Sequence, residues 1–131
     1  MQFIDGGVTA PLGFTANGML CGIKAGRTKN DVALVYSEKP CTAAGMFTRN
    51  RVKAESVKLT QRHVANGKAQ AMIANSGNAN ACTGSQGAQA AFRMAQAAAQ
   101  ALKIAPEDVI VCSTGVIGQQ LPVEKIEAAL P

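Results

Sequence analysis

Short apolar runs separated by polar, glycine-rich segments dominate the hydrophobic pattern of this chain, and they predict several strands. Residues 31–37, 69–74 and 109–112 each form such a run. Residues 109–112 are apolar without a break, which is typical of a strand buried on both faces, although periodicity alone leaves a buried helical turn open. Pro40 is expected to interrupt the chain, so residues 41–48 are predicted as a further strand, in a hairpin with the run before it.

A longer amphipathic pattern predicts one main helix at residues 85–103, which Pro106 is expected to end. Its apolar positions form one helical stripe: Ala88, Ala91, Phe92, Ala95, Ala99 and Leu102. Shorter helices are predicted at residues 56–65, with Gly67 in a left-handed cap, and after Pro122. The alternation of strands and helices predicts a mixed α/β fold.

Composition agrees with a single globular domain over residues 1–131. Apolar residues make up 47% of the chain and aromatic residues only 4%, so the core is expected to consist of small aliphatic side chains. No apolar stretch approaches the roughly 18 residues of a membrane helix, and the N-terminus lacks the pattern of a secretion signal. We therefore expect a cytoplasmic protein with no membrane partner.

The net charge of +5 is concentrated in residues 1–68, which hold ten of the thirteen basic residues. The densest cluster consists of Arg49, Arg51, Lys53, Lys58 and Arg62. No aromatic residue follows Phe47 within this cluster, so no nucleic-acid partner is expected. A solvated face explains the cluster, and the alternatives are an anionic small substrate and an acidic partner chain.

The chain offers few groups for metal binding or nucleophilic attack. The four cysteines form no C-x-x-C pair and the chain has one histidine, so no metal site is expected. Cys82 or Cys112 would need His63 as a base, and nothing in the sequence brings them together. Ser113 lacks the G-x-S-x-G arrangement of a serine nucleophile.

Donors that can stabilise an oxyanion follow the run at residues 109–112, at a strand end where ligands usually bind in α/β proteins. Thr114 offers a hydroxyl hydrogen, and Gly115 offers a backbone N–H with no side chain to keep a ligand away. Together they can form an oxyanion hole, although S-T-G is also common in simple turns. The sequence therefore predicts half of an active site, with donors but without a convincing nucleophile.

Residues 75–84 form a segment rich in Gly and Asn that leads into the main helix. The N-terminus of a helix can bind phosphate, but Gly77, Gly84 and Gly87 match neither the dinucleotide-binding pattern nor the P-loop. A tight loop stabilised by Asn side chains is the preferred interpretation.

Four phrases of the sequence resemble the ornithine acetyltransferase family, also called glutamate N-acetyltransferase: GFTANGMLCGIK, CTAAGMFTRNRVKA, MIANSGNANACTG and VIVCSTGVIG. The resemblance extends from about residue 7 to 130. It implies a mixed α+β sandwich of β-sheets and helices, of the type found in N-terminal-nucleophile enzymes. It also implies an acetyltransferase of arginine biosynthesis that moves an acetyl group from N-acetylornithine to glutamate.

The same resemblance implies a division of roles between two chains. In the family the precursor cuts itself at an Ala-Thr step, and the new N-terminal Thr of the β chain is the nucleophile of a ping-pong reaction. The family's oxyanion hole carries over to Thr114 and Gly115 of this chain. A heterotetramer of two α and two β chains is expected, with acetyl-CoA as a further donor in some members and no bound cofactor.

The sequence departs from the family pattern because it contains no Ala-Thr dipeptide and stops at Pro131. The cleavage motif, the nucleophilic Thr and the substrate-binding Thr and Lys of the family are expected beyond this end. We interpret the chain as the N-terminal portion of the α chain, inactive by itself. The alternatives are a self-processing aminopeptidase of the same fold and a non-catalytic module that binds an anion.

Overall fold

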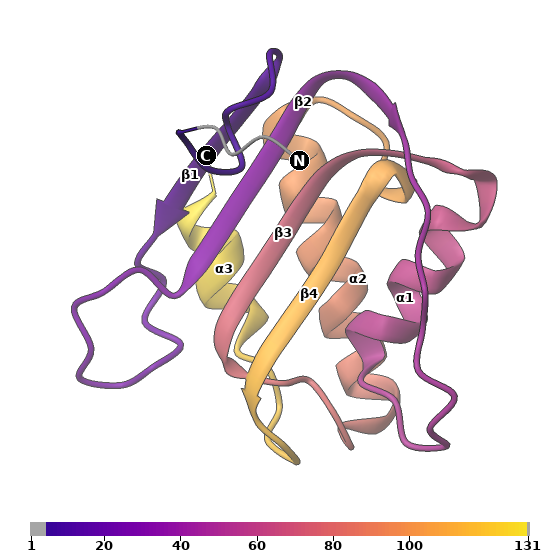
Figure 1. Ribbon diagram of the computed structural model, residues 1–131. Coiled ribbons are helices and arrows are strands. Elements are labelled where there is room, and N and C mark those ends of the chain that lie inside the picture. The colour runs from indigo at the N-terminus through magenta and orange to yellow at the C-terminus, as the bar shows by residue number, and fades with distance from the viewer. Residues whose placement is uncertain (1–4, 131) are drawn as a thin grey trace.

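The computed structural model describes residues 5–130, which form a four-stranded sheet with helices packed on one face (Figure 1). The strands are β1 (Phe14–Met19), β2 (Val32–Thr42), β3 (Lys68–Asn78) and β4 (Val109–Val116). The α-helices are α1 (Glu55–His63), α2 (Gly84–Leu102) and α3 (Val123–Ala129). The predicted mixed α/β fold is confirmed.

The order of the sheet, β1-β2-β3-β4, follows the order of the chain. The pairs β1–β2 and β2–β3 are antiparallel, whereas β3 and β4 are parallel. A parallel pair needs a long crossover, and α2 provides it. Because β3 and β4 run in the same direction, their carboxyl ends meet at one edge of the sheet (Figure 1).

The prediction of a strand break at Pro40 is wrong. Strand β2 continues through Pro40 to Thr42, and residues 43–48 form no strand. The pairing with β3 shifts its register between Tyr36 and Cys41, so Pro40 lies in an irregular stretch where its missing N–H removes no ladder hydrogen bond. The predicted hairpin between these two runs therefore does not exist.

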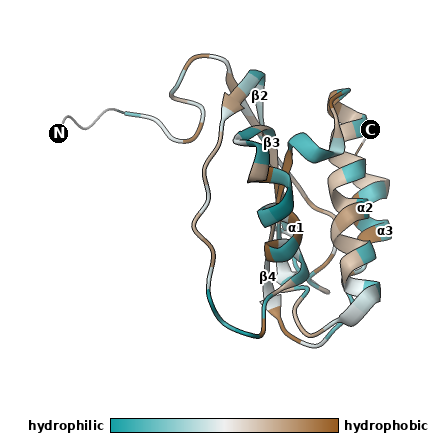
Figure 2. Ribbon diagram, turned by 90° about the vertical axis from the view of Figure 1, so that its right-hand side faces the viewer, coloured by the Kyte–Doolittle hydropathy of each residue, from teal (hydrophilic) through white to brown (hydrophobic). Residues whose placement is uncertain are grey.

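The helices cover only one face of the sheet. Figure 2 views the sheet from the side, with α2 and α3 together on one side of it and the N-terminal segment on the other. Val109 and Val111 of β4 point toward the helices and are buried, whereas Cys112 is exposed. The prediction that this strand is buried on both faces is therefore wrong, because on its second face Cys112 is exposed and Ile110 is only half-buried.

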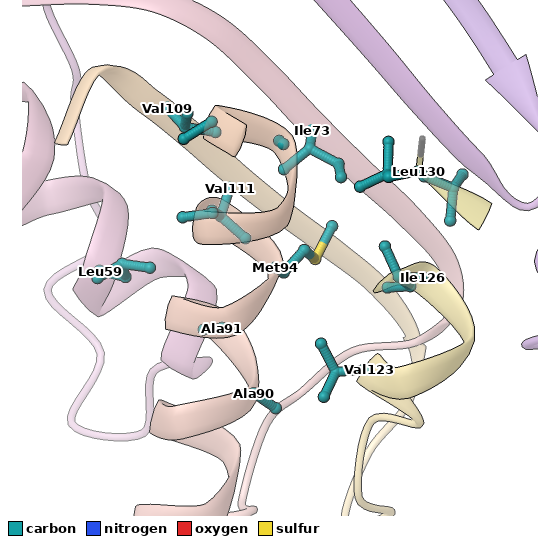
Figure 3. Packing of buried hydrophobic residues seen from close by; sticks show 14 of the residues in the cluster. Leu59, Ile73, Ala90, Ala91, Met94, Val109, Val111, Val123, Ile126 and Leu130 are labelled. Atoms are coloured by element: carbon teal, nitrogen blue, oxygen red, sulfur yellow. The ribbon is translucent and has the colours of Figure 1, made fainter. Parts of the chain in front are cut away.

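Helix α2 supplies the centre of the core, and small side chains dominate it as predicted (Figure 3). Met94, Ala95 and Ala98 are fully buried against Ile73 of β3 and the other apolar residues of the sheet. Alanine allows a helix to approach a sheet closely, which raises the packing density. Phe92, which the predicted stripe included, is 40% exposed, because the buried face of the helix is centred on the Met94 side.

Helix α2 begins and ends within one residue of its predicted bounds. It ends before Pro106 is reached, because Lys103 adopts the left-handed conformation with φ of 56°. Pro106 instead begins a short 3-10 turn, Pro106–Asp108, so its predicted role as helix terminator is wrong. The predicted cap after α1 is confirmed at Gly67, whose φ is 75°. Among residues 5–130, no helix combines the length and the hydropathy needed to cross a bilayer.

Candidate functional site

Thr114 and Gly115 lie in the last part of β4, at the edge where the parallel strands β3 and β4 end. The strand continues to Val116, so both residues belong to a strand end and not to a separate turn. Both line an open groove of about 640 Å³, whose other walls come from β3 and from the segment that follows β1. The two residues that carry the predicted donors are therefore both exposed and line the same groove.

Two glycines with positive φ are paired between β3 and β4 at this site. Gly77 is the register partner of Gly115, and their φ angles are 113° and 136°. A Cβ atom on Gly115 would lie 2.3 Å from the carbonyl carbon of Gly77 and 2.5 Å from the nitrogen of Asn78. Any side chain at position 115 would therefore collide with backbone, and only glycine fits there.

Asparagine side chains hold the segment after β3 and the turn after β4 together. The Asn78 amide donates hydrogen bonds to the carbonyl oxygens of Gln119 at 3.0 Å and Gln120 at 3.1 Å. Its Oδ1 accepts a hydrogen bond from the Asn80 N–H at 2.7 Å. Asn80 in turn donates to the Gly87 carbonyl of α2 at 2.9 Å. The predicted loop stabilised by Asn side chains is confirmed, although its first residues belong to β3.

Asp31, which the sequence does not single out as a functional residue, organises a third wall of the groove. Its buried carboxylate accepts backbone hydrogen bonds from Cys21 at 2.7 Å, Ile23 at 2.7 Å and Lys24 at 3.3 Å. Burial by itself would raise the pKa of Asp31, but the hydrogen bonds from these N–H groups outweigh burial and lower the pKa below its ordinary value. The carboxylate therefore stays ionised and fixes the course of the chain after β1.

The sequence carried only a weak signal for Asp31. It stands at the start of an apolar run, directly after a glycine-rich segment. A single acid at such a position is usually solvated, so the pattern alone does not distinguish a buried carboxylate from a surface one. Only the fold of the chain after β1, which turns back over the strand ends, brings three N–H groups to this side chain.

The cations that line the groove are Lys24 and Arg27. The basic cluster predicted from the sequence is a different one, at residues 49–62, and none of its members lines the groove. No Asp or Glu is among the residues that line the groove. The two salt bridges within residues 5–130, Lys58–Glu55 and Arg93–Glu127, lie elsewhere.

The residues considered for nucleophilic catalysis do not come together. His63 is buried in the contact between α1 and β4, where its Nδ1 donates to the Val109 carbonyl oxygen at 2.8 Å. Ser113 Oγ is buried and has no hydrogen-bond partner within the described chain. Cys82 and Cys112 are exposed. Over residues 5–130, no three residues of the His, Cys, Asp and Glu types are grouped as metal ligands would be.

Comparison with known proteins gives consistent matches over most of the chain. The ArgJ family model matches residues 15–131. The arginine biosynthesis bifunctional protein ArgJ of Caldanaerobacter subterraneus subsp. tengcongensis is 52% identical over 126 residues, which cover 96% of this chain and 31% of that protein. The ArgJ protein of Symbiobacterium thermophilum is 53% identical over 131 residues, which cover 99% of this chain and 33% of that protein. The chain spans about a third of the length of these curated relatives.

Two crystal structures resemble the fold closely. Ornithine acetyltransferase from Mycobacterium tuberculosis, solved in complex with ornithine, matches with a TM-score of 0.90 and 48% identity, over 95% of this chain and 67% of that chain. The arginine biosynthesis bifunctional protein ArgJ from Bacillus halodurans matches with a TM-score of 0.87 and 42% identity, over 94% of this chain and 64% of that chain. At these identities the likeness extends from fold to family.

Proposed function

This chain belongs to the ArgJ family, and we propose that it forms part of an enzyme that moves an acetyl group from N-acetylornithine to glutamate in arginine biosynthesis. The Mycobacterium tuberculosis neighbour is an ornithine acetyltransferase with ornithine bound, and ornithine is the amine that the proposed first half-reaction releases. The relatives are named bifunctional, which is consistent with acetyl-CoA as a second donor.

The observation that carries the proposal is the position of Thr114 and Gly115 in one groove at the carboxyl ends of β3 and β4. We assign the Thr114 hydroxyl and the Gly115 N–H as donors to the oxyanion. Each such donor typically contributes about 3 kcal/mol to the stability of the transition state. Glycine is required at position 115 because an added Cβ would collide with the backbone of Gly77, and Gly115 itself is exposed.

In the proposed reaction the nucleophile is the hydroxyl of an N-terminal Thr on a companion β chain. It attacks the acetyl carbonyl carbon of N-acetylornithine, and its proton passes to the N-terminal amine, which acts as the base. The carbonyl oxygen gains the negative charge and accepts hydrogen bonds from Thr114 and Gly115. Collapse of this intermediate breaks the C–N bond and releases ornithine with a proton on its amine. The amine of glutamate then attacks the acetyl ester, which forms N-acetylglutamate and restores the hydroxyl.

Incomplete burial beside the groove supports a companion chain at this end of the sheet. Val116, which lines the groove, is 49% exposed, and the adjacent Ile117 is 65% exposed. Apolar side chains this accessible, next to a site with donors but no nucleophile, suit a surface that another polypeptide covers. The family's assembly of two α and two β chains is the arrangement we propose.

Substitution of Thr114 tests the proposed function in the complete enzyme, assembled with the polypeptide that carries the nucleophile. We expect Thr114→Ala to lower kcat for acetyl transfer from N-acetylornithine to glutamate by roughly 10²–10³-fold, because one oxyanion donor is lost. Thr114 is exposed, so the variant should fold like the parent enzyme.

Thr114→Ser is the matched control, since it keeps the hydroxyl and should retain most of the activity. Peptide hydrolysis, assayed in parallel, distinguishes an aminopeptidase of the same fold. Unchanged acetyl transfer by Thr114→Ala would contradict the assigned role, and peptide hydrolysis without acetyl transfer would contradict the proposed reaction.

A further inference from the structure

The pairing of β3 and β4 becomes irregular at the two proposed donors. Earlier residues of β3 each have one partner on β4, whereas Asn78 is the register partner of both Thr114 and Val116. Gly115 lies between these two partners, and a Cβ atom on it would lie 2.5 Å from the Asn78 nitrogen. An irregularity of this kind re-aims the residues beside it, so the direction of the donors depends on what fixes the chain after β4.

One buried side chain, that of Asn78, fixes the segment that follows the donors. Its Nδ2 donates hydrogen bonds to the carbonyl oxygens of Gln119 at 3.0 Å and Gln120 at 3.1 Å. A backbone hydrogen bond from the Ala79 N–H to the Val116 carbonyl oxygen, at 2.9 Å, joins the same two segments. The chain that leaves β4 is therefore held against the chain that leaves β3, and the Asn78 amide provides two of the bonds.

Asn78 is itself held in place by its neighbours. Its Oδ1 accepts a hydrogen bond from the Asn80 N–H at 2.7 Å, and its carbonyl oxygen accepts one from Asn75 Nδ2 at 2.9 Å. Asn80 is fully buried and donates through its own Nδ2 to the Gly87 carbonyl oxygen near the start of α2. A side chain that is fixed in this way can hold catalytic groups within the narrow limits that a reaction requires.

The position of Asn78 separates it from the groove itself. Thr114 and Gly115 both line the groove, whereas Asn78 is not among its lining residues. An effect of Asn78 on the reaction is therefore expected to pass through the two donors. We propose that Asn78 is a positioning residue, whose amide orients the Thr114 hydroxyl and the Gly115 N–H toward the oxyanion. This inference rests on the function proposed above.

Such a role has a specific kinetic signature. The negative charge on the carbonyl oxygen develops in the transition state and is absent from the bound substrate, so a misplaced donor raises the barrier without weakening substrate binding. It should therefore lower kcat and leave KM nearly unchanged. A loss of stability alone would instead lower the amount of folded enzyme and leave kcat per active site unchanged.

Asn78→Asp in the complete enzyme tests the proposal. The aspartate keeps the shape and the Oδ1 acceptor for the Asn80 N–H, but it replaces the amide donor with an oxygen that faces two carbonyl oxygens. We expect kcat per active site for acetyl transfer from N-acetylornithine to glutamate to fall at least about tenfold, with KM within about twofold of the parent value. Asn78→Ser introduces no charge, and it provides the same measurement if Asn78→Asp does not fold.

Thr60→Val is the matched control for stability. It removes two hydrogen bonds to Val111 of the same strand, at 2.8 and 2.9 Å, and it changes no contact of the donors or of the chain after β4. Its kcat per active site should stay within about twofold of the parent value. If Asn78→Asp and Thr60→Val lower kcat alike, or if Asn78→Asp leaves kcat unchanged, Asn78 does not position the donors and the inference is wrong.

A double-mutant cycle with Thr114→Ala shows whether Asn78 acts through the donors. If Asn78 orients the Thr114 hydroxyl, the fold loss in kcat caused by Asn78→Asp should be at least about threefold smaller once that hydroxyl is absent. Equal losses in the two backgrounds would contradict the proposal. Failure of the proposed function itself has a different signature, since the parent enzyme would then transfer no acetyl group from N-acetylornithine to glutamate.

Discussion

Thr60 of α1 satisfies both backbone groups of Val111 on β4. Its hydroxyl donates to the Val111 carbonyl oxygen at 2.8 Å and accepts from the Val111 N–H at 2.9 Å. Because β4 is an edge strand, these two groups face away from β3 and have no ladder partner. An exposed edge invites pairing with other chains, and α1 covers this part of it. The strand that carries the proposed oxyanion donors is thus held on both sides.

Thr60→Val should destabilise the fold by about 2 kcal/mol, because it keeps the shape of the side chain but leaves the Val111 N–H and C=O unpaired. Urea denaturation measures the loss, and amide exchange at Val111 should become faster. Thr60→Ser retains the hydroxyl and is expected to cost less than half as much. Equal stability of Thr60→Val and the parent chain would show that water replaces both hydrogen bonds without cost.

Gly115→Ala should lower the stability by about 3 kcal/mol or more, because a residue with Cβ is strained at a φ of 136° and its Cβ collides with the backbone of Gly77. Acetyl transfer should fall with it, since β4 must shift at the donors. Gly118→Ala is the matched control: its φ is 81°, but no atom lies within 4 Å of an added Cβ, so only the conformational cost of about 1 kcal/mol is expected. Similar denaturation midpoints for the two variants would contradict the close contact.

Asp31→Asn should lower the stability at neutral pH by about 2 kcal/mol, since the carboxylate accepts three backbone hydrogen bonds and an amide cannot replace all of them. The pKa of Asp31 is lowered on folding, so its contribution is fully present above the ordinary value of 3.8 and is lost as the pH falls from there through the lower pKa of the folded state. The difference in stability between the parent and Asp31→Asn should therefore become smaller as the pH falls below 3.8.

Denaturation midpoints of the parent and of Asp31→Asn, determined between neutral pH and pH 2, measure this difference in stability. Glu38→Gln, which removes an exposed carboxylate, should leave the midpoint unchanged at neutral pH. A difference in stability that stays constant through the acid range would show that folding does not change the pKa of the Asp31 carboxylate.

Local patterns in the sequence were sufficient for most of the elements. The apolar run that begins at Val109 and the alanine-rich stretch of α2 each predicted the right element within a few residues. A hydroxyl and a glycine after an apolar run predict donors at Thr114 and Gly115, and the structure places both residues at a strand end that opens into a groove. Their roles as donors stay a prediction.

Features that depend on contacts between different elements could not be predicted from the sequence. Pro40 predicts a strand break, but β2 continues through it because the register between β2 and β3 shifts at that point. Phe92 fits a helical stripe, yet it is exposed because the packing against the sheet selects the Met94 side of the helix. Both errors arise because a local pattern does not specify which partner an element will meet.

The class of fold, the strand that carries Thr114 and Gly115, and the family can all be predicted from the sequence alone, because periodicity and motifs depend on residues that are neighbours in the chain. The position of Lys24 beside Thr114 and Gly115 in one groove, with its backbone bonded to Asp31, follows from the folded chain and not from any local pattern. This arrangement depends on the antiparallel pairing of β2 with β3 and the parallel pairing of β3 with β4. Such contacts join distant parts of the chain, so no local sequence pattern predicts them.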